Sequence, residues 1–169
     1  WFVFRALYGH VKDIVEALKA ENVEVYVPMH YEKVDISGNM RLRKMPLLPG
    51  LVFAYMTRKK TLDFVRQPAP TARYMKYYTD KTKKVEAETG HNPPITIPDA
   101  KMNSFINICE TKNEHIMTTS KDRCRFKSGD KFKVVSGEFK GVVGQVVRAA
   151  GQQRIAVELQ GIGYVLTAY

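Results

Sequence analysis

Closely spaced glycines between short apolar runs constrain the C-terminal third of this chain more than any other feature. Residues 131–135 alternate charged with apolar side chains, which is the period of a half-buried strand. Further runs of β-branched or alternating apolar residues cover 142–147, 154–159 and 164–167, and a glycine-containing turn separates each run from the next. Short strands joined by tight turns predict a small closed β-barrel, because closure removes the exposed strand edges that invite aggregation.

The charge of the chain points to a polyanionic partner. Its 169 residues are enough for one medium domain or two small ones, and they include 27 lysines and arginines against 17 acidic residues. Residues 1–110 carry 17 basic and 12 acidic side chains, and residues 111–169 carry 10 and 5, so no separate basic tail explains the excess. Nucleic acid is the natural inference, with a merely soluble basic surface as the alternative.

The first 110 residues predict alternating strands and helices. Val11, Ile14, Val15 and Leu18 follow the i, i+3, i+4, i+7 spacing of a helix of about ten residues. The unbroken apolar run 51–56 predicts a central strand covered on at least one face. The other expected elements are strands at 1–8, 23–27 and 71–78, a hairpin over 31–44 that turns at 37–39, and helices at 61–67 and from Pro98 to Cys109. This order is typical of an α+β sandwich with an antiparallel sheet.

The residue types required for catalysis or metal binding do not occur at suitable spacings. The histidines are scattered, and no phosphate-binding loop, nucleophile elbow or carboxylate pair is present. Cys109 and His115 are close in sequence, but Cys109 falls on the apolar face of an expected helix, where a buried structural thiol is favoured over a nucleophile. We therefore predict no enzyme, no cofactor and no metal. No apolar run reaches the ~18 residues of a membrane helix, so no membrane partner is predicted.

Three basic groups fall at hairpins or loop ends, where long cationic side chains can reach phosphates. The group on the hairpin is the predicted nucleic-acid-binding site and consists of Arg41, Arg43 and Lys44. The other two groups are residues 58–60 and the lysines within 81–84. The alternative for each group is an ordinary solvated face.

The C-terminal segment resembles a KOW motif, the small SH3-like barrel of ribosomal proteins and NusG-type transcription factors. The residues that carry the resemblance are Gly129-Asp130, Val134-Val135, Ser136-Gly137, Phe139-Lys140-Gly141, Gly144 and Val146-Val147. An unrelated small barrel with ordinary hairpin glycines is the alternative.

Residues 1–110 resemble the NusG N-terminal (NGN) domain. The matching features are Trp1-Phe-Val3, the turn at Gly9, Val27-Pro28, the charged hairpin and Leu48-Pro-Gly-Leu-Val-Phe53. The resemblance implies an NGN domain at 1–110, a linker at 111–126 and a KOW barrel at 127–169. Within the family, the stretches 137–144 and 151–157 are most similar to the UpxY-type antiterminators of capsular polysaccharide operons.

The resemblance to NusG proteins implies a cytoplasmic factor that binds bacterial RNA polymerase and suppresses pausing and termination. In that family an apolar depression on the NGN sheet grips the clamp helices of the largest polymerase subunit. The positions here that match the grip are Arg5, Leu51 and Phe53, with Tyr8 and Tyr55 as neighbours. Leu51 departs from the aromatic residue that relatives often have there, and core packing is the alternative role for Phe53 and Tyr55.

Alternation along the strand places Leu51, Phe53 and Tyr55 on one face, and Val52 and Ala54 on the other. This pattern predicts a sheet that packs helices behind and presents an apolar patch in front.

The resemblance also implies further partners. The hairpin is expected to contact non-template DNA or nascent RNA. The loop Phe139-Lys140-Gly141 is the expected partner-binding loop of the barrel, and the alternatives for its partner are a ribosomal protein, a termination factor, RNA or the N-terminal domain of the same chain. The alternative function is that of a KOW-containing RNA-binding protein of the ribosome or its assembly. The NGN-like first domain distinguishes the two, because ribosomal KOW proteins lack it.

Overall fold

The computed structural model describes residues 1–111, 116–119, 125–149 and 151–167. Contacts between residues group the chain into two compact units, residues 1–27 with 49–97 and residues 28–48 with 98–169. Much of the expected linker 111–126 lies outside the described residues. The expected division of the chain at residues 110 and 126 stays a prediction.

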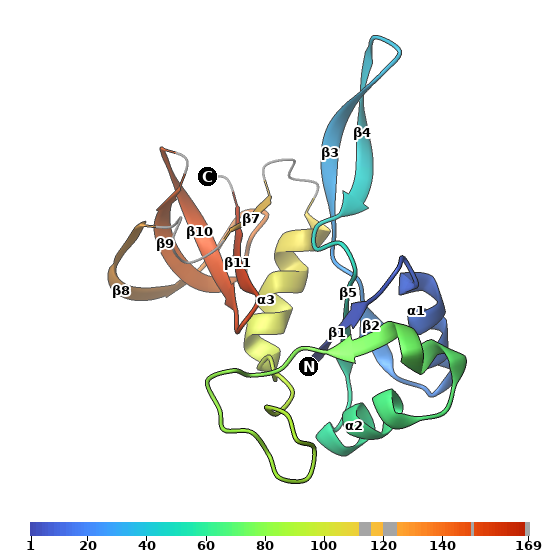
Figure 1. Ribbon diagram of the computed structural model, residues 1–169. Helices are drawn as coiled ribbons and strands as arrows, with labels where there is room; N and C mark the ends of the chain where they lie inside the picture. Colours follow the sequence, from blue (N-terminus) through green and yellow to red (C-terminus); the bar gives the residue numbers. More distant parts are fainter. Residues whose placement is uncertain (112–115, 120–124, 150, 168–169) are drawn as a thin grey trace. The chain divides into compact units, whose positions relative to one another are not determined.

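An antiparallel four-stranded sheet in the order β2-β5-β1-β6 forms the centre of the first unit (Figure 1). Its strands are β1 (Phe2–Ala6), β2 (Glu24–Tyr26), β5 (Leu51–Tyr55) and β6 (Met75–Tyr77). The apolar run that begins at Leu51 was expected to form a central strand, and this prediction is confirmed, because β5 pairs with β2 on one side and β1 on the other.

Two helices, α1 (Val11–Ala20) and α2 (Arg58–Arg66), pack on one face of this sheet. Ile14 and Leu18 of α1 are fully buried and join Phe64 of α2 in one apolar cluster with alternate residues of β1 and β5. The predicted ten-residue helix from Val11 is thereby confirmed.

The start of α2 differs from the sequence prediction, which placed it at residue 61. Thr57 caps the helix, since its Oγ1 accepts a hydrogen bond from the backbone N–H of Lys60 at 3.2 Å. A threonine at this position satisfies one of the free N–H groups of the first turn, so the helix begins at Arg58.

The strand expected over 71–78 is wrong for most of its length. Pro70–Tyr74 forms a 3₁₀ helix, η1, and only Met75–Tyr77 pairs with β1 as strand β6. Pro70 fixes its own φ at a value suited to the start of a helical turn, and the N–H of Ala72 donates to the carbonyl of Ala69 at 3.1 Å. Tyrosine-rich composition favours strands, but the local backbone geometry determines the outcome here.

A long β-hairpin, β3 (Met29–Ile36) with β4 (Asn39–Pro46), belongs to the second unit. Ser37 and Gly38 form its two-residue loop, and both have positive φ (54° and 82°), as a type I′ turn requires. The N–H of Gly38 donates to Asp35 Oδ1 at 2.7 Å, which closes the turn further. In Figure 1 the hairpin extends away from the other elements of its own unit.

The rest of the second unit is helix α3 (Asp99–Glu110) and a five-stranded antiparallel sheet in the order β7-β11-β10-β9-β8. The strands are β7 (Met117–Thr119), β8 (Arg125–Lys133), β9 (Val143–Ala149), β10 (Gln152–Leu159) and β11 (Gly163–Leu166). Helix α3 contacts β9 and β10. Ser104 Oγ accepts the backbone N–H of Val143 at 3.0 Å, and Lys101 Nζ lies 3.0 Å from Glu158 Oε2.

The fold class predicted from the sequence is confirmed. Helices and an antiparallel sheet make up the N-terminal part, and a separate small antiparallel sheet follows at the C-terminus. Among the described residues, no helix is both long and apolar enough to cross a membrane.

Candidate functional site

The strand register places the expected polymerase-binding residues of the sheet on the face opposite the helices. Val52 and Ala54 belong to the helix-facing apolar cluster, so Leu51, Phe53 and Tyr55 lie on the other face. Arg5 is directly across from Leu51 on β1, which places it on this face as well. The predicted two-faced pattern of β5 is therefore confirmed.

Exposure divides these residues into two groups. Phe53 has 0% of its surface exposed and Leu51 is also buried, whereas Tyr55 is 51% exposed and Arg5 is exposed. The ring of Tyr55 lies against that of Trp1, with 5.4 Å between the centroids. Among the expected residues, this face therefore exposes an aromatic ring and a guanidinium group rather than an apolar patch. The register adds two exposed charged residues that the sequence analysis did not assign to it, Lys76 across from Arg5 and Glu24 across from Tyr55. A binding role for Leu51 and Phe53 stays a prediction.

Tyr8 lies in the turn after β1 and not on the sheet. It is 87% exposed and has a positive φ of 53°, which is a strained conformation for a bulky residue. Its ring meets Tyr74 edge-on at 6.4 Å, and His10 stacks on Tyr74 at 3.8 Å. Sequence reasoning missed both neighbours, because it assigned Tyr74 to a strand and found no role for His10.

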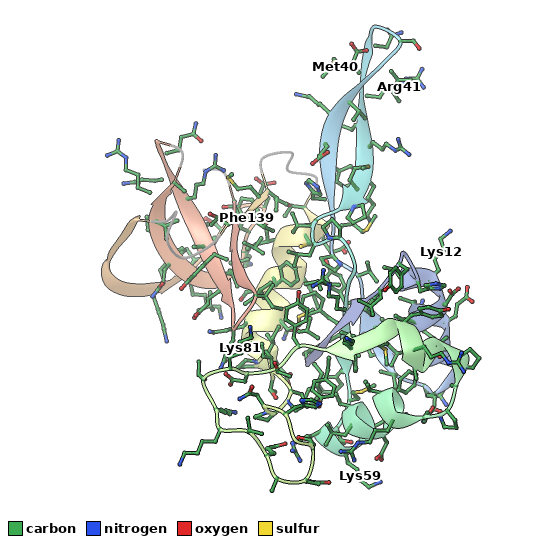
Figure 2. All side chains as sticks on the ribbon, in the orientation of Figure 1. Lys12, Met40, Arg41, Lys59, Lys81 and Phe139 are labelled. Carbon is green, nitrogen blue, oxygen red and sulfur yellow. The ribbon has the colours of Figure 1, made fainter. Side chains whose placement is uncertain are left out.

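The predicted nucleic-acid-binding residues Arg41, Arg43 and Lys44, named here the hairpin cations, are all exposed. The register places Arg41 and Arg43 on one face of the hairpin, opposite Val34 and Glu32, and Lys44 on the other face. Within the described parts of the chain, none of the hairpin cations forms a salt bridge. Their positive charge is therefore available to a partner. Figure 2 shows the Arg41 side chain projecting from the distal part of the ribbon.

The second basic group differs from the hairpin cations. Arg58, Lys59 and Lys60 were expected at a loop end, but they form the first turn of α2. Each forms a salt bridge to a carboxylate of its own unit, and the partners are Glu86, Asp63 and Glu21 respectively. Each of these cations already has an acidic partner in its own unit, unlike the hairpin cations, so the structure favours the solvated-face interpretation for this group.

The third group lies in the loop after β6, as predicted. Lys83 Nζ is 3.8 Å from Asp80 Oδ2, and Lys81 and Lys84 are exposed. Hydrogen bonds from the hydroxyl and the backbone N–H of Thr82 lower the pKa of the Asp80 carboxyl from its usual 3.8, with a smaller contribution from Lys83. Asp80 organises the start of this loop.

The loop Phe139-Lys140-Gly141 has a defined conformation. Phe139 is buried, Lys140 is exposed, and Gly141 has a φ of 90° that favours glycine. The N–H of Gly141 donates to the carbonyl of Val134 at 2.8 Å. Next to this loop is a cavity of about 510 Å³ whose lining includes Phe139 and Val135. Val135 was expected in a strand, but β8 ends at Lys133 and leaves its side chain exposed.

Cys109 is buried in α3, as expected for a structural thiol, and His115 lies outside the described residues. In the described ranges, no group of three or more potential metal ligands comes together.

Comparison with known proteins identifies a family that the chain matches. A family model described as "Transcription termination factor nusG" matches residues 1–106. No curated protein matches the chain significantly. The matched residues include the whole four-stranded sheet, both helices that cover it, and the β3–β4 hairpin.

Proposed function

Because this chain belongs to the NusG family, we propose that it is a transcription elongation and antitermination factor. In this proposal it binds bacterial RNA polymerase through its N-terminal domain and suppresses pausing and termination. The observation that carries the proposal is the family match over 1–106, which includes the sheet and the hairpin. The similarity of 137–144 and 151–157 to UpxY-type proteins supports antitermination at capsular polysaccharide operons.

The proposed polymerase contact lies on the sheet face opposite α1 and α2, against the clamp helices of the largest subunit. Arg5 and Tyr55 supply exposed groups on this surface, and Tyr8 adds an exposed ring in the neighbouring turn. Tyrosine and arginine are enriched at protein interfaces, because they combine apolar area with a polar group that can bind at the rim. Leu51 and Phe53 support this surface from within.

The proposed nucleic-acid contact is the hairpin, whose target in this proposal is non-template DNA or nascent RNA. Its support is the absence of salt bridges to Arg41, Arg43 and Lys44 within the described residues, in contrast to the paired cations of α2. Each cation that neutralises a phosphate releases condensed counterions, so binding here should depend strongly on salt.

The proposed KOW barrel is the C-terminal sheet, and its proposed partner is a ribosomal protein or a termination factor. The supporting feature is the cavity beside Phe139, where the exposed Val135 adds apolar surface. Exposed apolar surface around a cavity is typical of protein-binding sites.

The test measures binding of the full chain to RNA polymerase elongation complexes, together with readthrough of a terminator in vitro. We expect the double variant Arg5→Ala/Tyr55→Ala to bind at least about tenfold more weakly and to lose readthrough. Lys59→Ala is the matched control, because it removes an exposed cation from α2, away from the proposed surface. Capture of ribosomal subunits and not polymerase by the full chain would contradict the proposal.

A further inference from the structure

The tip of the β3–β4 hairpin carries large apolar side chains in solvent. Met40 is 63% exposed, Leu42 is 54% exposed and Ile36 is 46% exposed. Figure 2 shows Met40 next to Arg41 near the end of the ribbon. A contiguous group of exposed apolar side chains on a soluble domain is typical of an interaction site.

The register determines which of these residues act together. Met40 and Leu42 share a face with Lys44, while Ile36 shares the other face with Arg41 and Arg43. Each face therefore combines an apolar tip with cations closer to the base of the hairpin. Met40 and Leu42 form the larger apolar pair, named here the tip pair.

The tip pair is held on a pre-formed support. The type I′ turn fixes the two strands in register, and Asp35 Oδ1 accepts the Gly38 N–H at 2.7 Å. This hydrogen bond turns one oxygen of Asp35, the acidic residue nearest the turn within β3 and β4, inward to the turn. A rigid support reduces the conformational entropy lost when the tip binds.

We propose that the tip pair packs against unpaired bases of nucleic acid, as an apolar wedge, while the hairpin cations bind the flanking phosphates. The inference rests on the proposed nucleic-acid role of the hairpin and identifies what the tip contributes to it. Charge complementarity selects this partner, because cations occupy both faces around an apolar end. Unstacked bases expose apolar faces, and a phosphate follows each nucleotide along the nucleic-acid backbone. A partner of this kind therefore offers apolar and anionic groups side by side.

The experiment uses the full chain and a DNA fork in which 2-aminopurine occupies the unpaired strand next to the junction. Binding to a fully paired duplex and binding to RNA polymerase are measured in parallel. Affinity is measured over a range of salt concentrations, and 2-aminopurine fluorescence reports base unstacking. We expect Met40→Ala/Leu42→Ala to bind roughly tenfold more weakly, with an unchanged salt slope and without the fluorescence change. Val85→Ala is the matched control, because it truncates an exposed apolar side chain outside the hairpin.

The arms of the experiment separate the wedge from the nucleic-acid role on which it rests. If alanine at all three hairpin cations lowers the salt slope while the tip variant binds and fluoresces like the parent, the wedge is refuted and the nucleic-acid role stands. If the cation variant leaves binding unchanged, the nucleic-acid role itself fails.

Equal losses by the tip variant on the fork and on a fully paired duplex would also overturn the wedge. A tip variant that loses only polymerase binding would assign the tip to a protein contact, which refutes the wedge as well. Thermal unfolding of the tip variant should match the parent, since both side chains are exposed.

Discussion

Phe53 provides the sharpest test of how this sheet divides its residues between stability and binding. Its side chain has 0% exposure, and its cross-strand neighbour Val3 is also buried. Truncation of such a ring removes its packing and leaves a cavity, which costs about 3–5 kcal/mol in comparable sites. The whole free energy of unfolding of a domain is about 5–15 kcal/mol. Phe53→Ala should therefore remove a large fraction of the stability of the first unit.

The assay is thermal unfolding by circular dichroism, with Tyr55→Ala as the matched variant on the same face of β5. For a domain of this size each kcal/mol shifts Tm by roughly 4–8 °C, so Phe53→Ala should lower Tm by more than about 12 °C. Tyr55 is 51% exposed and loses mainly its contact with Trp1, so its loss should cost only about 1 kcal/mol. A Phe53→Ala protein with the parental Tm and no polymerase binding would refute this reasoning, because the ring would then act at the surface.

Three further predictions concern other parts of the chain. Alanine at all three hairpin cations should flatten the dependence of elongation-complex affinity on salt concentration, and an unchanged slope would assign them to solubility. Gly144→Ala should lower the Tm of the C-terminal sheet, because its Cβ would lie 2.6 Å from the carbonyl oxygen of Ala156; a parental Tm would show that the strands can separate without cost. Because the folded-state pKa of Asp80 is lowered, its contribution to stability is present above the usual pKa of 3.8 and is lost as pH falls through the lower folded value. Asp80→Asn should make stability less dependent on pH in that acidic range, and a pH profile identical to that of the parent would contradict the assignment.

Sequence periodicity predicted the elements whose faces differ in polarity. The stripe of α1 follows from one buried face, so it could be read directly from residue order. The unbroken apolar run of β5 predicted a central strand for a different reason, because Leu51 to Ala54 are buried on both faces of the sheet. The hairpin was predictable because Ser37-Gly38 matches the turn geometry that its strands need.

The errors occurred where a neighbour outside the local pattern determined the result. Pro70 changed a tyrosine-rich segment from strand to 3₁₀ helix, and Thr57 moved the start of α2. The burial of Phe53 could not be predicted, because alternation tells which side chains share a face but not what covers that face. The isolated charge of the hairpin cations was equally hidden, since ion pairs such as Lys60–Glu21 join residues far apart in the sequence.

The two-residue period of the hairpin limits how its length can change. Adding one residue to each strand below the tip would lengthen the ribbon but rotate the tip to the opposite side relative to its base. If the residue added to β4 lies between Leu42 and Arg43, Met40 and Leu42 would project from the side that Arg43 occupies, although the sequence of the tip and its turn had not changed. Adding two residues to each strand would restore their direction and only extend their reach. Lengths that preserve the direction of this tip therefore differ by two residues per strand, so the hairpin can vary in reach only in discrete steps.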